Sequence, residues 1–301
     1  MEYKSEYIDV IHNFCVDCEF PSEAETALVS AFEKTFADRE AFSYIADRID
    51  EYEKRTYLPF ICVLQVISYY AKRDDISEYT MHLLFYILLS EILHKRYIYS
   101  GIPETIFHDS MMDLRWKMNE CYNVYGIWGT FAGNWTSGFY LMKLFALGRL
   151  QYELIGYPSN NTYIKNGYFW KLETPVLNVH IPSSGSLKEE DCYASYASAK
   201  KFYTPYFISE APIAIVCSSW LLSPYHNVML PETSNIRRFA SDFDLISSED
   251  YMDNNILWRI FGKMDCNDIE NLPRKTLLQI KYAERLEKGL PIGMGFGIRI
   301  I

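Results

Sequence analysis

The spacing of apolar residues changes partway along the chain. Up to about residue 125, apolar residues recur every three to four positions, which predicts amphipathic helices. These helices are expected at 3–17, from 21 onward, and at 41–52, 57–70, 77–96 and 102–122. The stretch 77–96 is apolar on most sides, so we expect it at the centre of a helical bundle.

Beyond residue 125 the pattern shifts to short β-type runs separated by turns. Alternating or continuously apolar runs predict strands at 149–157, 167–173, 176–181, 213–219, 245–247, 256–261 and 292–301. Further helices are expected at 139–147, 186–203, 227–230, 235–243 and 276–288. The fold class is therefore α/β: an all-helical N-terminal domain, residues 1–125, followed by a mixed β-sheet flanked by helices, residues 126–301.

Charge supports this division and narrows the function. Residues 1–125 hold 12 Lys and Arg against 22 Asp and Glu, whereas the remaining 17 of each sign cancel. The net charge of −10 argues against a general nucleic-acid binder, because the phosphate backbone is also negative. Two interpretations of the acidic half are open: it repels acidic partners such as acyl-carrier proteins, or it only keeps the protein in solution.

Other sequence features bear on location and cofactors. Seven scattered cysteines favour reduced thiols. No apolar run is long enough to span a bilayer, and the N-terminus lacks the pattern of a signal peptide, so we expect a cytoplasmic protein. Cys15 and Cys18 form a single CxxC on a predicted helix, which indicates small core residues rather than a zinc site. No other spacing indicates a metal, and none is expected.

The segment 176–203 has the strongest local signature. A buried strand carrying a single His180 ends at Pro182, which has no N–H to donate. The loop Ser183-Ser184-Gly185 follows, and Ser186 with Glu189 predicts a capping box at the start of a helix. Free N–H groups at such a turn suit an anion such as phosphate. The alternative is an ordinary strand-to-helix crossover with a good cap.

Several motifs give the chain a family resemblance. They are Gly148-Arg149-Leu150-Gln151-Tyr152-Glu153, Val179-His180-Ile181-Pro182 with Gly185 and Leu187, Ser219-Trp220-Leu221-Leu222-Ser223-Pro224, Ser234-Asn235-Ile236, Leu272-Pro273 and the glycines of the last strand. The chain resembles a bacterial family of acyltransferase-domain proteins with a helical N-terminal domain and a GNAT-like (GCN5-related N-acetyltransferase) C-terminal domain. The resemblance covers about residues 126–301.

The resemblance implies a site for acyl-coenzyme A. In GNAT folds a strand, its loop and the next helix hold the pyrophosphate, and the pantetheine arm lies between two splayed strands. The corresponding donor-binding residues here are Ile181, Ser183, Ser184, Gly185, Ser186, Leu187, Ser218 and Ser219. The usual loop is a Gln/Arg-x-x-Gly-x-Gly/Ala run. This chain departs from it, because Pro182 to Leu187 keeps one glycine and has no basic residue.

Three residues are candidates for the chemistry of acyl transfer, which removes a proton from an amine and returns one to the leaving thiolate. His180 is the candidate base, since imidazole titrates near neutral pH; otherwise it is a core histidine. Glu153 is a second candidate, placed at the end of an adjacent strand, or else an exposed strand residue. Tyr225 lies where GNAT proteins often place the acid, although it also suits a surface position at a helix start.

These features together predict an N-acyltransferase that moves an acyl group from an acyl-coenzyme A thioester to a small-molecule amine. The altered loop leaves a second hypothesis open, a catalytically silent GNAT-like module that binds a ligand or partner. A third is an acyltransferase that uses an acyl-carrier protein as the donor.

Overall fold

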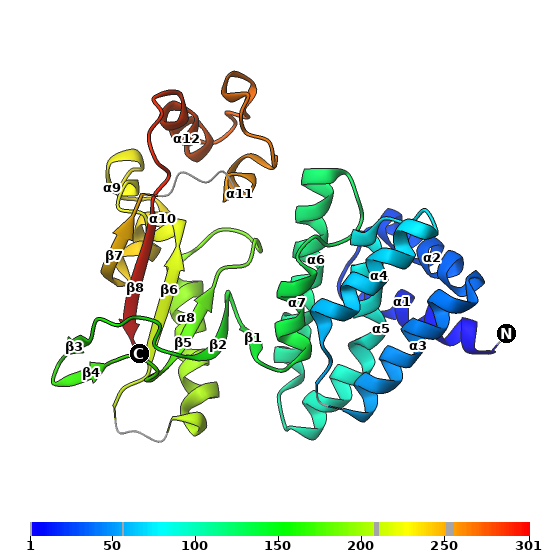
Figure 1. The fold of residues 1–301 in the computed structure, drawn as a ribbon. Helices are drawn as coiled ribbons and strands as arrows, with labels where there is room; N and C mark the ends of the chain where they lie inside the picture. Colours follow the sequence, from blue (N-terminus) through cyan, green and yellow to red (C-terminus); the bar gives the residue numbers. More distant parts are fainter. Residues whose placement is uncertain (1, 56, 208–210, 251–255) are drawn as a thin grey trace. The chain divides into compact units, whose positions relative to one another are not determined.

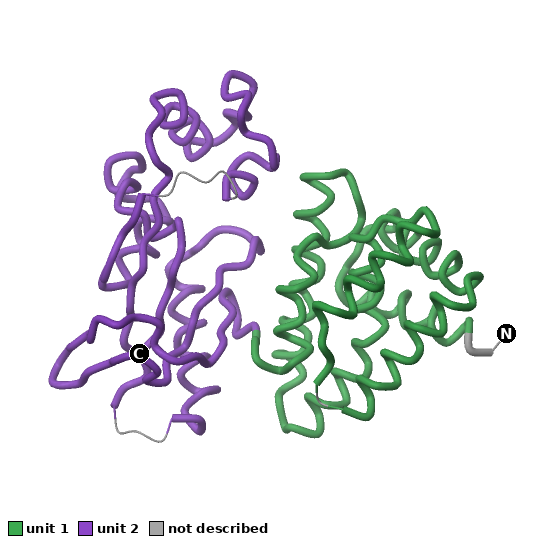
Figure 2. The backbone as a smooth tube through the Cα atoms, in the orientation of Figure 1, with its two compact units in different colours: residues 1–145 green, residues 146–301 purple. Residues whose placement is uncertain are grey.

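The computed structural model describes residues 2–55, 57–207, 211–250 and 256–301. The chain divides into two compact units, residues 1–145 and 146–301 (Figure 2). The described part of the first unit is helical, with α1 (Glu2–Asp17), α2 (Ser22–Ala37), α3 (Arg39–Lys54), α4 (Phe60–Arg73), α5 (Glu78–Tyr99), α6 (Glu104–Tyr125) and α7 (Gly133–Tyr140).

Helix α5 is the centre of the first unit. It contacts every other helix of the unit. Its side chains are buried on all sides, among them Met81, Leu84, Phe85 and Leu88. A helix that is apolar all round can bury every face only in such a position, which confirms the expectation for 77–96.

Helix α7 is tied to the helical unit by three buried tyrosines. Tyr86 donates its hydroxyl to the carbonyl of Gly133 at 2.6 Å, and Tyr140 donates to the carbonyl of Tyr86 at 2.6 Å. Tyr52 donates to the carbonyl of Tyr140 at 2.7 Å. Helix α7 is thus part of the first compact unit, which ends at residue 145.

The second unit contains a mixed six-stranded sheet in the order β1-β2-β5-β6-β8-β7 (Figure 1). Its strands are β1 (Leu144–Leu147), β2 (Leu150–Gly156), β5 (Pro175–His180), β6 (Ala214–Ser219), β7 (Asp244–Glu249) and β8 (Met294–Ile300). Strands β3 (Tyr163–Lys165) and β4 (Tyr168–Trp170) form a separate hairpin. The helices are α8 (Glu189–Tyr203), α9 (His226–Met229), α10 (Asn235–Ser241), α11 (Trp258–Phe261) and α12 (Leu277–Glu287), with short 3-10 turns η1 (Thr204–Tyr206), η2 (Trp220–Leu222) and η4 (Ile269–Asn271).

The two faces of the sheet are covered differently. Helix α8 packs on the face that carries Tyr152, whose hydroxyl lies 3.0 Å from that of Ser195. Tyr203 of α8 donates to the backbone carbonyl of Tyr152 at 2.9 Å. On the opposite face, Trp170 of the β3–β4 hairpin packs with Val176. Because successive side chains of a strand point to opposite faces, the sheet has apolar residues on both sides.

A lobe of α11, η4 and α12 lies beyond the end of the sheet where β6 ends and β8 begins (Figure 1). It has its own apolar core, which includes Leu257, Phe261, Tyr282 and Ile292 and packs against Trp220. Helix α12 begins with a capping box between Thr276 and Gln279, as its expected start at 276 requires.

Two sequence expectations are corrected here. The run 256–261 is not a strand, because α11 closes on Gly262 in the left-handed conformation (φ 67°), a common helix end. The expected helix 139–147 is not formed either. Helix α7 ends at Tyr140, Met142 takes a positive φ of 53°, and β1 follows. Short apolar runs do not distinguish helix from strand, and here the turn decides.

The predicted fold class is confirmed: a helical N-terminal region precedes a mixed sheet flanked by helices. The glycines of β8 also behave as expected for close backbone approach. A Cβ on Gly295 would lie 2.4 Å from the carbonyl oxygen of Leu222. Among the described helices, none is both long and apolar enough to cross a membrane.

Candidate active site

The central parallel strands of the sheet separate toward their C-terminal ends. Strands β5 and β6 are paired only at Leu177 with Ile215 and Asn178 with Val216. Beyond that point β5 stays paired with β2 as far as His180, and β6 with β8 as far as Ser219. The facing edges of Val179–His180 and 217–219 therefore form no ladder with each other in the described structure. Backbone groups at such edges have no partner in a β5–β6 ladder.

A polar cluster lies on β2 and β5 beside this opening. Glu153 pairs directly with Asn178 in the antiparallel register, and His180 lies two residues further along the same face. The Nε2 atom of His180 is 2.8 Å from Oε1 of Glu153. Asn178 donates from Nδ2 to the same carboxylate oxygen at 2.9 Å. The side chains of His180 and Glu153 are 22% and 32% exposed, so water reaches both.

Nδ2 of Asn178 also lies 3.1 Å from Nε2 of His180. An ionised carboxylate only accepts hydrogen bonds, so His180 donates to Glu153 in the tautomer that carries its proton on Nε2. Glu153 is on a strand adjacent to His180 as expected, but it lies in the middle of β2 rather than at the strand's end.

The predicted anion loop follows β5. Ser183, Gly185 and Ser186 are exposed, Ser184 is half-buried, and Leu187 is buried at 7% exposure. No backbone N–H of residues 183–188 donates to an acceptor within the described chain. Gly185 has a φ of 118°, which L-residues rarely adopt.

The expected capping box at Ser186 is not present. Helix α8 begins at Glu189, and its N-cap residue Lys188 makes no side-chain cap. The reason is that the loop is held outside the helix by the side chain of Arg149. The guanidinium donates to the carbonyls of Pro182 and Ser186, each at 3.1 Å, and of Gly185 at 2.7 Å.

The remaining donor-site candidates differ in their surroundings. Ser218 is exposed, and the β5–β6 register places it on the face that carries His180. Ser219 is 9% exposed, and its hydroxyl accepts from the backbone N–H of Leu221 at 3.1 Å, capping η2. Ile181 is half-buried directly after β5.

Tyr225, the candidate acid, has its hydroxyl committed to Asp250, to which it donates a hydrogen bond. That bond, ahead of burial, raises the pKa of Tyr225. The guanidinium of Arg285 stacks over its ring, 3.7 Å from the centroid. Giving its proton to a thiolate would require the phenol to leave Asp250. The contacts described for Tyr225 are thus with Asp250 and Arg285, and not with the His180–Glu153 pair.

Two residues of this region escaped the sequence analysis. Asn178 is the only strongly polar residue besides His180 in its strand, and their spacing of two places them on one face. That spacing was a usable signal. Arg149 carries no comparable signal, because its partners lie 33 to 37 positions away in the sequence.

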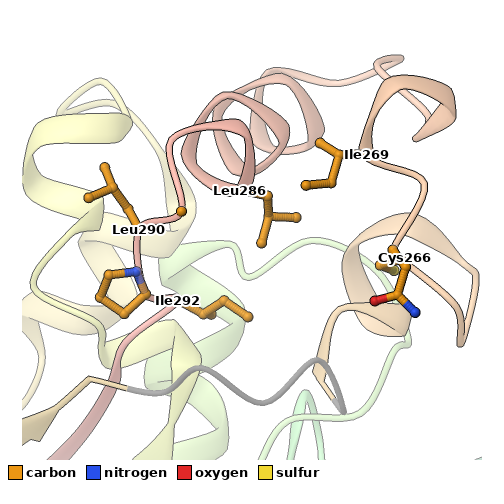
Figure 3. A pocket seen from close by; sticks show the side chains of 8 residues that line it. Cys266, Ile269, Leu286, Leu290 and Ile292 are labelled. Atoms are coloured by element: carbon orange, nitrogen blue, oxygen red, sulfur yellow. The ribbon is translucent and has the colours of Figure 1, made fainter.

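Two cavities lie away from these residues. One of about 250 Å³ is in the C-terminal lobe, where Leu286, Leu290 and Ile292 line it together with Cys266 and Ile269 (Figure 3). Another, of about 810 Å³, lies among α1, α5 and α6 of the helical unit. Neither is lined by a predicted site residue. Within the described residues no group of three or more His, Cys, Asp or Glu is placed to hold a metal ion.

An open parallel strand pair followed by a loop and a helix is the arrangement that the sequence resemblance implies for a GNAT-like α/β domain. The model of a GNAT-like C-terminal domain matches residues 144–299, and that of an N-acyltransferase N-terminal domain matches residues 9–142. The chain therefore belongs to this family of N-acyltransferases. No curated protein matches the sequence.

Solved structures agree with the assignment. An acyltransferase crystallised with decanoyl-CoA is 26% identical, with a TM-score of 0.60 over 72% of this chain. That alignment spans 65% of the other chain. An acyltransferase crystallised with decanoyl-CoA and teicoplanin is 20% identical, with a TM-score of 0.70 over 96% of this chain and 87% of the other. At 20% identity the second likeness shows the fold alone.

Proposed function

We propose that the protein is an N-acyltransferase that moves an acyl group from an acyl-coenzyme A thioester to an amine. The observation that carries the proposal is the opening between β5 and β6, with the loop 183–188 at its end. Membership of the N-acyltransferase family supports it. The acyltransferase structures with decanoyl-CoA support the choice of donor.

In this proposal the donor lies along the opening. The amide groups of pantetheine hydrogen-bond to the facing edges of β5 and β6 at Val179 and Ser218, where the two strands form no ladder with each other. The pyrophosphate binds the N–H groups of the loop at Ser183, Ser184, Gly185 and Ser186, with the N-terminal end of α8 close behind. Ile181 and Leu187 flank the same segment.

The chemistry then falls to the polar cluster. His180 takes the proton from the attacking amine on Nδ1, and Glu153 stabilises the imidazolium through Nε2. The amine nitrogen forms a bond to the thioester carbon, the carbon–sulfur bond breaks, and the thiolate leaves with the coenzyme. The thiolate is protonated by Tyr225 once its phenol leaves Asp250, or by solvent.

Ligand binding tests the donor directly. The melting temperature of the wild type is measured with acetyl-, octanoyl- and decanoyl-coenzyme A at millimolar concentration. A ligand at one hundred times its Kd stabilises by about 2.7 kcal/mol, which is a rise of several degrees for a unit of this size. Gly185→Asp should abolish most of the rise, because it adds negative charge to the anion loop. No shift with any acyl-coenzyme A would refute the donor.

The same measurements separate the rivals. A silent ligand-binding module, favoured by the lack of a basic residue within Ser183–Leu187, would show the thermal shift without turnover of any amine. A carrier-protein-dependent enzyme would show neither shift nor turnover with coenzyme A thioesters, and activity only with an acyl-carrier protein. The acidic helical half argues against that partner. We place the protein in the cytoplasm, on the sequence argument from its cysteines.

A further inference from the structure

The side chain of Arg149 lies beneath the anion loop rather than in it. The residue stands between Gly148 and β2, and its guanidinium donates hydrogen bonds to three loop carbonyls, those of Pro182, Gly185 and Ser186. The side chain is half-buried, and burial lowers the pKa of Arg149, although a guanidinium stays charged at any physiological pH. Few side chains other than arginine can reach three acceptors at once, because its donors form a fixed fork.

These bonds fix which way the loop peptides point. In a trans peptide the carbonyl and the following N–H point in opposite directions. With the carbonyls of Pro182, Gly185 and Ser186 turned toward Arg149, the N–H groups of Ser183, Ser186 and Leu187 turn away from it. In the described chain, none of these N–H groups donates to a protein acceptor.

The arrangement also supplies charge where the loop itself has little. The first turn of α8 carries Glu189, Glu190 and Asp191, which oppose a bound phosphate. Asp191 is close enough to Arg149 to raise the pKa of the guanidinium. A cation behind the loop peptides polarises their N–H groups, since charge-assisted hydrogen bonds are stronger than neutral ones.

We infer that Arg149 is the positioning residue of the donor site: it holds the peptides of residues 182–187 so that their N–H groups face the pyrophosphate of the donor. From the turn between β1 and β2, it replaces the basic residue that the loop lacks. The inference rests on the proposed acyl-coenzyme A donor. Arg149 does not touch the reacting atoms, so its effect is on donor affinity.

The experiment compares two donors that differ in the pyrophosphate. The full-length wild type, Arg149→Gln and Arg149→Lys are titrated with coenzyme A by calorimetry, and KM and kcat are measured with octanoyl-coenzyme A and octanoyl-pantetheine. Arg149→Gln should weaken coenzyme A about 10- to 100-fold, as expected for lost hydrogen bonds to a charged group. Its KM for octanoyl-pantetheine, which has no pyrophosphate, should change less than about twofold.

Arg149→Lys keeps the charge but cannot hold three carbonyls, so its affinity should fall between the wild type and Arg149→Gln. Arg274→Gln is the matched control. It removes the same charge, but Arg274 is paired with Glu287 in the C-terminal lobe. It should bind coenzyme A like the wild type.

The outcomes are distinguishable. Equal losses for both donors, or a loss of folding in Arg149→Gln together with wild-type affinity in Arg149→Lys, would make Arg149 a structural support and overturn the inference. If Arg149→Gln is folded and binds coenzyme A as tightly as the wild type, the positioning role of Arg149 is overturned, whereas the proposed function is not affected. A wild type that does not bind coenzyme A at all would overturn the proposed function and this inference together.

Discussion

The imidazole Nε2 of His180 and the carboxylate Oε1 of Glu153 lie 2.8 Å apart, across two adjacent antiparallel strands. Asn178 donates to the same carboxylate oxygen and thereby fixes its position. Because both strands are rigidly paired here, the imidazole is held in one orientation beside the opening between β5 and β6. If His180 is the base, as we propose, a base held in this way loses little orientation entropy when the amine binds.

We therefore expect His180→Ala to lower kcat by about 10²- to 10⁴-fold, the usual contribution of a general base. Glu153→Gln should cost less, about 10- to 100-fold, because the imidazole keeps its position but loses the partner that stabilises its charge. The rate of thiol release from octanoyl-coenzyme A, with a saturating amine, measures both.

His108→Ala is the control, since His108 is an exposed residue of α6 in the helical unit. Coenzyme A affinity should stay within about twofold in all three variants, because these side chains act on the chemical step. Full activity in His180→Ala would remove this residue from the mechanism.

The sequence predicted the fold wherever the apolar pattern was long and regular. Helix α5 was predicted because its apolar pattern continues for 22 residues. Strand β5 was predicted because its apolar residues Val176, Leu177 and Val179 are interrupted only by polar residues on one face. The prediction failed for two short segments: residues 256–261 contain α11, and residues 139–147 contain the end of α7 and strand β1. In both, a residue with positive φ, Gly262 or Met142, ends the helix.

The site was predicted in part for a related reason. His180 and Glu153 were identified from strand pattern and family resemblance, and the structure brings them together. Their register, and with it the role of Asn178, depends on strand pairing that a single sequence does not encode locally. The contacts between Arg149 and the loop arise only after the sheet is assembled, so no spacing rule could reveal them.

A second prediction concerns the opening itself. Ser218 is exposed at the separated end of β6, on the face that carries His180. Ser218→Trp should obstruct the donor and raise the Kd for coenzyme A at least about tenfold, since displacing a bound chain from a slot forfeits most of its contacts. Calorimetric titration measures the change.

Ser248→Trp provides the comparison, because Ser248 is likewise exposed but lies on β7 at the far edge of the sheet. Both variants should melt within about 2 °C of the wild type, as surface substitutions usually cost little. Wild-type affinity in Ser218→Trp would mean that the donor does not use this slot.

A third prediction follows from the contact between β8 and η2. A Cβ on Gly295 would lie 2.4 Å from the carbonyl oxygen of Leu222, an atom of the backbone that cannot rotate away. Gly295→Ala should cost about 1 to 3 kcal/mol, as overpacking does, and lower the melting temperature by several degrees. Gly167→Ala, where a Cβ meets nothing within 4 Å but φ is 81°, should cost only about 1 kcal/mol. Equal melting temperatures for Gly295→Ala and the wild type would contradict the steric argument.

The last prediction concerns pH and a buried histidine near the end of β6. His226 is 1% exposed, with Nδ1 3.3 Å from the carbonyl of Leu221 and Nε2 2.7 Å from the hydroxyl of Tyr282. A neutral imidazole satisfies both contacts, by donating from Nδ1 and accepting from Tyr282. Burial, assisted by the charge of Arg285, lowers the pKa of His226 to about 4.

The sign of the effect follows from proton binding. Since the unfolded chain takes up the proton near pH 6.5 and the folded chain only near pH 4, the free energy of unfolding falls as the pH is lowered between these values. The loss approaches about 1.4 kcal/mol per pH unit. Between pH 7 and pH 4.5 His226 should thus contribute a loss of about 2 to 3 kcal/mol.

Urea unfolding at pH 7 and pH 4.5, followed by tryptophan fluorescence, measures this loss in the wild type and in His226→Gln. The glutamine variant is expected to be less stable at pH 7, because it repacks a buried site. Its loss on acidification should nevertheless be smaller by about 2 to 3 kcal/mol, since the group that the unfolded chain protonates is gone. His108→Gln, a change at an exposed position, should lose as much unfolding free energy between pH 7 and pH 4.5 as the wild type. An identical loss in the wild type and in His226→Gln would show that carboxylates, and not this histidine, set the acid sensitivity of the second unit.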